Sequence, residues 1–128
     1  MKLLFDTHAL IWWFEGSARL SAKARDIIVQ ADVTVLVSVV SAFEMTTKHR
    51  LGKLGQVAEL LEHLPRYLDS QGFEILPLSL AHAELGGNFD FDHRDPFDRL
   101  LIAQAQIEQA VLVSNEALFD RYAVQRLW

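Results

Sequence analysis

VTVLVSVVSAFE, at residues 33–44, joins an unbroken apolar run to the start of a helical pattern. The run Val33–Ser38 is rich in β-branched residues and lacks polar alternation, which is typical of a strand covered on both faces. Ser41 then suits the cap position of a helix that we expect to reach about Leu51 and to end at Gly52. A doubly covered strand that leads into a helix predicts an α/β protein.

The same alternation of short apolar runs and helical periodicity extends to both ends of the chain. Further strands are expected at Lys2–Phe5, Phe73–Leu76, Val111–Ser114 and Val124–Leu127. Helices are expected at Leu10–Phe14, Ser21–Gln30, Gln56–Ser70, Ser79–Leu85, Pro96–Glu108 and Glu116–Tyr122, with a loop over Gly86–Arg94. Strands that alternate with helices pair in parallel through right-handed crossovers. We therefore predict a three-layer α/β/α sandwich with a central, mainly parallel sheet, formed by residues 1–128 as one domain.

Length and composition exclude several classes of protein. A chain of 128 residues suits one domain. The absence of cysteine excludes a disulfide framework, a thiolate zinc site and a cysteine nucleophile, and it fits a reducing compartment. The N-terminus reaches Asp6 after only three apolar residues, and no later run approaches the ~20 apolar residues of a membrane span. We therefore expect a cytoplasmic protein with no membrane segment.

The net charge is −5, from 17 acidic and 12 basic side chains. On charge alone this argues against a nucleic-acid-binding protein, because contacts to phosphate need a cationic surface. The objection weakens if several carboxylates converge on divalent cations, since the ions then dominate the local field. The positions of the acidic residues therefore decide the matter.

Four acidic residues from four separate segments fall at one edge of the predicted sheet. Asp6 ends the first strand, Glu44 and Asp98 lie in the first turns of two helices, and Glu116 follows the strand Val111–Ser114. Ligands bind beyond the carboxyl ends of parallel strands, which is where these residues are placed. Lysine and arginine are largely missing from the same positions, so we expect these carboxylates to be unpaired.

Each of these acids also has a purely structural interpretation. Ser41 and Glu44 match a capping box. Asp98 lies in the first turn of a helix that Asp95 is well placed to cap. Asp6 has such an explanation only if it caps the helix that follows it. The placement of all four acids at one edge argues for a shared site.

Clustered carboxylates raise one another's pKa, and a hard divalent cation removes that cost. Ligand sets made of oxygen atoms favour Mg²⁺ or Mn²⁺ over zinc. Such ions polarise a phosphodiester, activate water and stabilise the leaving oxygen. Four of the five histidines, His8, His49, His82 and His93, have no metal-ligand spacing with one another, and we treat them as ordinary. The pattern predicts metal-assisted phosphodiester hydrolysis.

Three motifs carry a resemblance to a known family. DTHALIW at residues 6–12, SAFE at 41–44 and HRDPFDRLLIAQA at 93–105 resemble PIN-domain proteins, most of all the VapC-type toxins of bacterial toxin–antitoxin pairs. The likeness extends to the closing residues 122–128, and the long motif at 93–105 is the specific one. The resemblance implies a parallel-sheet fold, RNA cleavage that depends on Mg²⁺ or Mn²⁺, a homodimer, and inhibition by a cognate antitoxin.

The resemblance also implies roles for individual residues. The three core acids of the family fall on Asp6, Glu44 and Asp98, which would hold the metal. The fourth family position falls on residues 114–116, where Glu116 stands in place of the usual aspartate and leaves one-ion and two-ion binding open. Residues expected to support the ligands by hydrogen bonds are Thr7, Ser114, Asn115 and Asp95.

We therefore predict a metal-dependent endoribonuclease, the toxin of a toxin–antitoxin pair, that hydrolyses RNA with metal-activated water. Candidates for phosphate contact are Lys48, Arg50, Lys53, Arg94 and Arg99. A haloacid-dehalogenase-like phosphatase is excluded because His8 stands where a second aspartate is needed, and no P-loop motif occurs. Two alternatives stay open: a non-enzymatic PIN-like interaction module and a structure-specific DNA nuclease. Only the family resemblance favours RNA over DNA.

Overall fold

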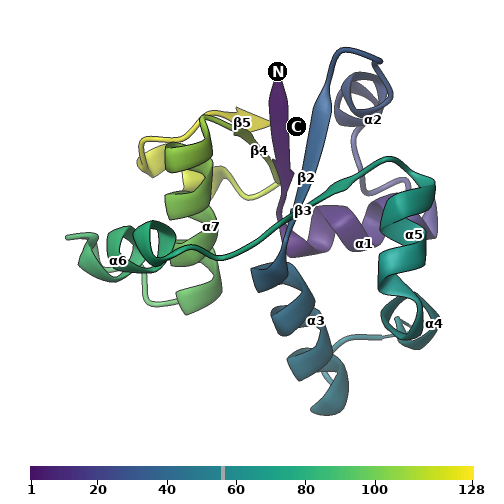
Figure 1. Ribbon diagram of the computed structural model, residues 1–128, viewed down its shortest axis with the longest axis horizontal. Coiled ribbons are helices and arrows are strands. Elements are labelled where there is room, and N and C mark those ends of the chain that lie inside the picture. The colour runs from purple at the N-terminus through teal and green to yellow at the C-terminus, as the bar shows by residue number, and fades with distance from the viewer. Residues whose placement is uncertain (56) are drawn as a thin grey trace.

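The computed structural model describes residues 1–55 and 57–128. Within them a five-stranded sheet has the order β3-β2-β1-β4-β5, and every pairing is parallel (Figure 1). The strands are β1 (Lys2–Phe5), β2 (Thr34–Ser38), β3 (Glu74–Leu76), β4 (Val111–Val113) and β5 (Arg126–Leu127). The expectation of a mainly parallel sheet is therefore confirmed.

Helices cover both faces of this sheet (Figure 1). The helices are α1 (Thr7–Glu15), α2 (Ala22–Ile28), α3 (Val39–Arg50), α4 (Ala58–Glu62), α5 (Leu64–Ser70), α6 (Leu80–Asn88) and α7 (Pro96–Glu108), with a 3₁₀ helix η1 (Ala117–Arg121). Helices α1, α2, α4 and α5 lie on one side of the sheet, and α6 and α7 lie on the other (Figure 1). The predicted three-layer α/β/α sandwich is confirmed. None of the helices in the described residues is both long and apolar enough to cross a membrane.

Alternate side chains of the central strands enter two separate cores. Leu3 and Phe5 pack in the core beneath α1 and α2, whereas Leu4 packs in the core beneath α7. All three side chains are fully buried. Because helices cover both faces of the sheet, neither side of a central strand faces water, and polar residues do not alternate with apolar ones. This explains the unbroken apolar runs of the sequence.

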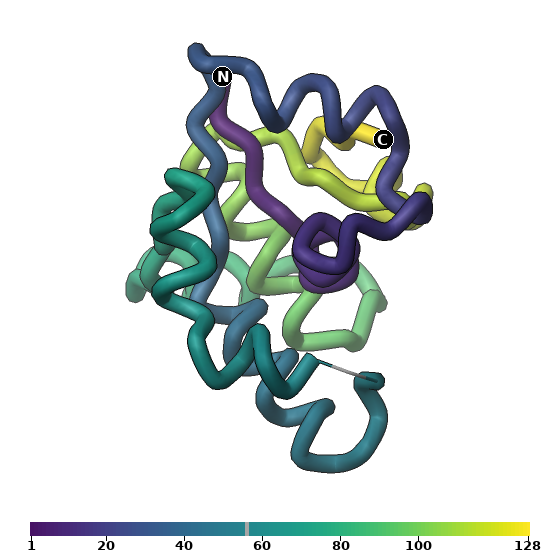
Figure 2. The backbone as a smooth tube through the Cα atoms, turned by 90° about the vertical axis from the view of Figure 1, so that its right-hand side faces the viewer, coloured from purple at the N-terminus to yellow at the C-terminus, as the bar shows by residue number. Residues whose placement is uncertain are grey.

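From β1 the chain adds β2 and β3 on one side of the sheet, and then adds β4 and β5 on the other side of β1. The chain leaves β1 into α1 on one face of the sheet, as the purple segment of Figure 2 shows. After β4 it continues into η1, whose Phe119 packs in the core of the opposite face. Connections that diverge in this way leave a crevice at the carboxyl ends of the two strands, which is the usual ligand position in open α/β sheets. Asp6 and Ser114 lie at these two ends.

Two expected boundaries are wrong. Helix α3 is capped by Ser38 and not by Ser41, because the Ser38 hydroxyl accepts a hydrogen bond from the Val40 amide at 3.0 Å. The segment Gly86–Arg94 begins as helix and not as loop, since α6 continues to Asn88. A Cβ atom on Gly86 would lie 3.2 Å from Leu100, so glycine lets α6 approach α7 closely.

The expected helix Gln56–Ser70 is two helices. Helix α4 ends at Glu62 and α5 begins at Leu64, with His63 between them in a non-helical conformation. Pro65 at the start of α5 suits this break, because proline is tolerated in the first turn of a helix. Gln56 itself lies outside the described residues. The last predicted helix, Glu116–Tyr122, is the shorter 3₁₀ helix η1.

Candidate active site

Asp6 lies at the carboxyl end of β1 and is 5% exposed. Its Oδ1 atom accepts a hydrogen bond from the Ala9 amide at 2.8 Å, so Asp6 does cap α1. Burial raises the pKa of Asp6 to about 6, against the lowering effect of hydrogen bonds from Ser114 and Ala9. The charge of Glu116 raises it further. A capping hydrogen bond ordinarily stabilises the charged carboxylate and lowers its pKa. Because the pKa of Asp6 is raised overall, the cap does not offset the cost of burying this charge.

Asp98 lies in the first turn of α7, but it does not cap that helix. Asp95 is the cap, because its Oδ1 accepts from the amides of Phe97 at 2.9 Å and Asp98 at 3.3 Å. Burial raises the pKa of the Asp98 carboxyl to about 6, and the charges of Asp95 and Glu116 add to this effect. The Asp98 side chain is therefore left available for another role.

His93 is a member of this site that the sequence analysis missed. Its Nε2 atom lies 2.8 Å from Oδ2 of Asp98 and lowers the pKa of that carboxyl. The signal in the sequence was its place five residues before Asp98 in the HRDPFD motif, since a turn between them returns the imidazole to the helix start. The contact depends on the path of that turn, which side-chain spacing alone does not define.

Glu44 is buried on α3, and the capping-box interpretation of this residue is wrong because Ser38 is the cap. The Thr7 hydroxyl donates to Oε1 of Glu44 at 2.6 Å, and it lies 3.1 Å from the Ser41 hydroxyl. The ammonium of Lys48 lies 2.5 Å from Oε2 of the same carboxylate. Both oxygens of Glu44 are thus engaged, and the expectation that these acids lack a lysine or arginine partner is wrong for Glu44.

Glu116 is exposed and occupies the position before η1. Its backbone amide donates to the Ser114 hydroxyl at 3.0 Å, and the neighbouring Asn115 is also exposed. The charge of Glu116 acts on both Asp6 and Asp98. Glu116 therefore belongs to the same electrostatic group as Asp6 and Asp98.

The charge of Glu116 acts on Asp6 and Asp98, and Glu44 contacts Thr7, the residue after Asp6, but the four acids do not form a closed set of metal ligands. Among residues 1–55 and 57–128, no group of three or more histidine, cysteine, aspartate or glutamate side chains is close enough to hold an ion as placed. The donor chemistry nevertheless fits Mg²⁺ or Mn²⁺, because all four candidates offer carboxylate oxygens. Two of them also carry raised pKa values that a nearby cation would relieve. The residues present therefore suit a hard divalent ion.

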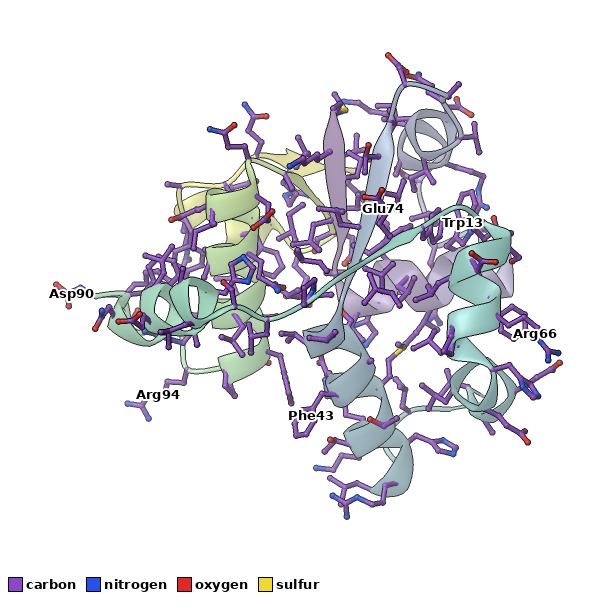
Figure 3. All side chains as sticks on the ribbon, in the orientation of Figure 1. Trp13, Phe43, Arg66, Glu74, Asp90 and Arg94 are labelled. Atoms are coloured by element: carbon purple, nitrogen blue, oxygen red, sulfur yellow. The ribbon has the colours of Figure 1, made fainter. Side chains whose placement is uncertain are left out.

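Arg99 holds the segment that leads into α7. Its guanidinium donates to five backbone carbonyls, those of Gly86, Gly87, Phe89, Phe91 and His93. With its donors used in this way, Arg99 positions the chain around His93, and its predicted contact to phosphate is wrong. Arg94 is exposed and its side chain extends away from the body of the protein (Figure 3).

This chain belongs to the PIN-domain family, whose family model matches residues 3–125. No curated protein matches the sequence. Solved structures with a similar fold include VapBC2 from Rickettsia felis bound to a DNA fragment from the promoter (TM-score 0.69, 16% identity, covering 99% of this chain and 98% of that chain). A toxin–antitoxin complex from Klebsiella pneumoniae (TM-score 0.65, 18% identity, 98% and 96%) and FitAcB from Neisseria gonorrhoeae (TM-score 0.66, 18% identity, 100% and 97%) are also similar.

Proposed function

We propose that this chain is an endoribonuclease that depends on Mg²⁺ or Mn²⁺ and acts in the cytoplasm as the toxin of a toxin–antitoxin pair. Residues 1–128 form its single PIN domain. The observation that carries the proposal is a pair of aspartates, the buried Asp6 after β1 and the partly buried Asp98 at the start of α7, whose pKa values are both raised to about 6. Membership of the PIN family and the likeness to toxin–antitoxin complexes support it.

The residues that would hold the ion are Asp6, Glu44, Asp98 and Glu116. When bound, a divalent ion supplies charge neutralisation for the phosphodiester and a more acidic water. The chain's own residues orient the ligands: Thr7 fixes Oε1 of Glu44, and His93 fixes Oδ2 of Asp98. Ser114 hydrogen-bonds Asp6. Such supporting contacts hold ligand oxygens in place before substrate arrives.

Incubation of the purified protein with a mixed pool of single-stranded RNA tests this function. Cleavage is expected with Mn²⁺ or Mg²⁺ and is expected to stop when a chelator is added, because carboxylates alone repel the phosphodiester and cannot neutralise its charge. A parallel pool of single-stranded DNA should stay intact. Cleavage that persists in chelator would contradict the proposal. Cleavage of DNA alone would support the alternative of a structure-specific DNA nuclease.

An apolar groove beside the site supports the proposed homodimer. Its lining includes Val39 and Phe43 of α3, Leu78, and Phe97 and Leu100 of α7. Phe43 is 63% exposed and extends outward between α3 and α7 (Figure 3). Exposed apolar surface of this kind commonly marks a protein interface.

Replacing Phe43 by Glu is therefore expected to convert a dimer into a monomer, because the new charge would be desolvated at the interface. Analytical ultracentrifugation of wild type and F43E over a range of concentrations measures this. Since the side chain is mostly exposed, the melting temperature of the monomeric form should hardly change. A wild-type protein that stays monomeric at all concentrations would contradict the homodimer.

The proposed antitoxin would present a basic residue to the acidic group. The net charge of −5 and the four carboxylates at the site favour a cationic partner segment. Co-expression with a candidate antitoxin should give a stable complex in which RNA cleavage is inhibited. A complex that forms without inhibition would place the antitoxin elsewhere on the surface.

A further inference from the structure

Lys48 is the basic side chain paired with Glu44, the buried acidic residue of α3. It lies one turn after Glu44 on the same helix, and its Nζ atom is 2.5 Å from Oε2 of that carboxylate. The side chain of Lys48 is 32% exposed, whereas that of Glu44 is 6% exposed. The ammonium therefore sits at the boundary between the buried carboxylate and solvent.

The charge environment of Lys48 extends beyond this single pair. Burial lowers the pKa of Lys48, but the hydrogen bond and charge of Glu44 and the charges of Asp95 and Asp98 raise it overall. An ordinary i, i+4 ion pair on a helix surface involves only its two members and contributes little stability. Lys48 instead lies in the combined electrostatic field of Glu44 on α3 and of Asp95 and Asp98 at the start of α7.

Both oxygens of Glu44 are already occupied, one by Thr7 and one by Lys48. The Thr7 hydroxyl is neutral and compatible with a second, cationic partner on the carboxylate. The Lys48 ammonium is itself a cation, and two cations within a few ångströms of each other repel strongly where solvent is partly excluded. A divalent ion and Lys48 therefore compete for the same carboxylate oxygen.

We propose that Lys48 is the resident counter-cation of this carboxylate group and that it leaves Glu44 when a divalent metal ion binds. The inference rests on the proposed function, because it assumes that the ion binds at Glu44 and Asp98. Its consequence is that Lys48 weakens metal binding and stabilises the metal-free arrangement. The affinity for metal is thus set partly by a residue that is not itself a ligand.

The test is a calorimetric titration of Mn²⁺ into wild type and K48M, with no RNA present. K48M is expected to bind Mn²⁺ about tenfold more tightly, since the competing charge is gone. K23M removes the same charge from the exposed face of α2 and is expected to bind like wild type. Equal affinities of K48M and wild type for Mn²⁺ would overturn the proposal that the metal ion displaces Lys48 from Glu44.

D98N in the same titration separates this inference from the proposed function. If D98N loses Mn²⁺ binding while K48M matches wild type, the metal site stands and the exchange is wrong. If neither wild type nor K48M binds Mn²⁺, the proposed metal site and the exchange fall together.

A second measurement follows the wild-type chain, with K48R used only to assign the signal, and so does not depend on the folding of K48M. The ¹⁵Nζ signal of Lys48, assigned by its absence from K48R, is followed by NMR as Mg²⁺ is added. We expect a slowly exchanging ammonium signal without metal and its shift or loss with Mg²⁺. A signal that stays unchanged while the Glu44 carboxyl carbon shifts would overturn the proposal.

Discussion

Asp98→Asn is expected to reduce metal-dependent RNA cleavage on the order of a thousandfold, because a ligand charge is lost where charge develops in the reaction. Asp95 caps α7 and Asp98 does not, so the change removes no cap from that helix. The altered group is a partly buried carboxyl whose charged form is disfavoured. The folded structure should therefore persist, which circular dichroism and a melting curve can check.

The matched control for D98N is D90N. Asp90 lies between α6 and α7, and its side chain extends away from the protein at the end of this segment (Figure 3). The substitution changes the net charge by the same amount without touching the acidic group. We expect D90N to cleave RNA like wild type. If D98N were as active as D90N in the same Mn²⁺ buffer, Asp98 would have no part in the reaction.

Asp6→Asn is expected to stabilise the metal-free protein at pH 8 by at most about 3 kcal/mol. The pKa of Asp6 is raised from 3.8 to about 6 by burial, so the folded state binds the proton more tightly than the unfolded chain. The stability that this carboxyl contributes is thus fully present below pH 3.8 and is lost as the pH rises through 6. Asparagine keeps the cap on the Ala9 amide, so the change isolates the charge.

Denaturant unfolding of wild type and D6N in chelator, at pH 4 and pH 8, measures this effect. The gain in unfolding free energy should be large at pH 8 and close to zero at pH 4. D120N is the control, because Arg126 lowers the pKa of the exposed Asp120 and its loss should give no gain at pH 8. A D6N variant less stable than wild type at pH 8 would mean that Asp6 is well solvated or paired.

The strands and the layer arrangement were predictable because they rest on local pattern. Residues of β1 and β2 are buried on both faces, so their apolar runs have no polar alternation that could be confused with another structure. The start of α3 was harder to predict, because Ser38 and Ser41 are both good caps and lie about one turn apart. The end of β2 at Ser38 decides between them, and sheet pairing sets that end.

The acidic group was predictable as a set, but only some of its partners were. Asp6 follows β1, Asp98 lies in the first turn of α7, and Glu44 lies in the second turn of α3, one turn later than expected; the topology brings positions after strands and near helix starts to one edge. The contact of His93 with Asp98 depends on the segment that Arg99 holds through backbone carbonyls. The spacing of His93 and Asp98 alone does not define that contact. Lys48 stands four residues after Glu44, a spacing that brings side chains together on a helix, so this pair could have been predicted from the sequence.

The proposed function depends above all on a divalent ion held by Asp6, which is buried after β1, and by Asp98, which is partly buried in the first turn of α7. A crystal grown or soaked with Mn²⁺ and measured for anomalous scattering tests it most directly. We expect an anomalous peak about 2 Å from carboxylate oxygens of Asp6 and Asp98, with Lys48 displaced from Glu44. Full Mn²⁺ occupancy elsewhere, with Asp6 and Asp98 free of metal in an actively cleaving protein, would contradict it.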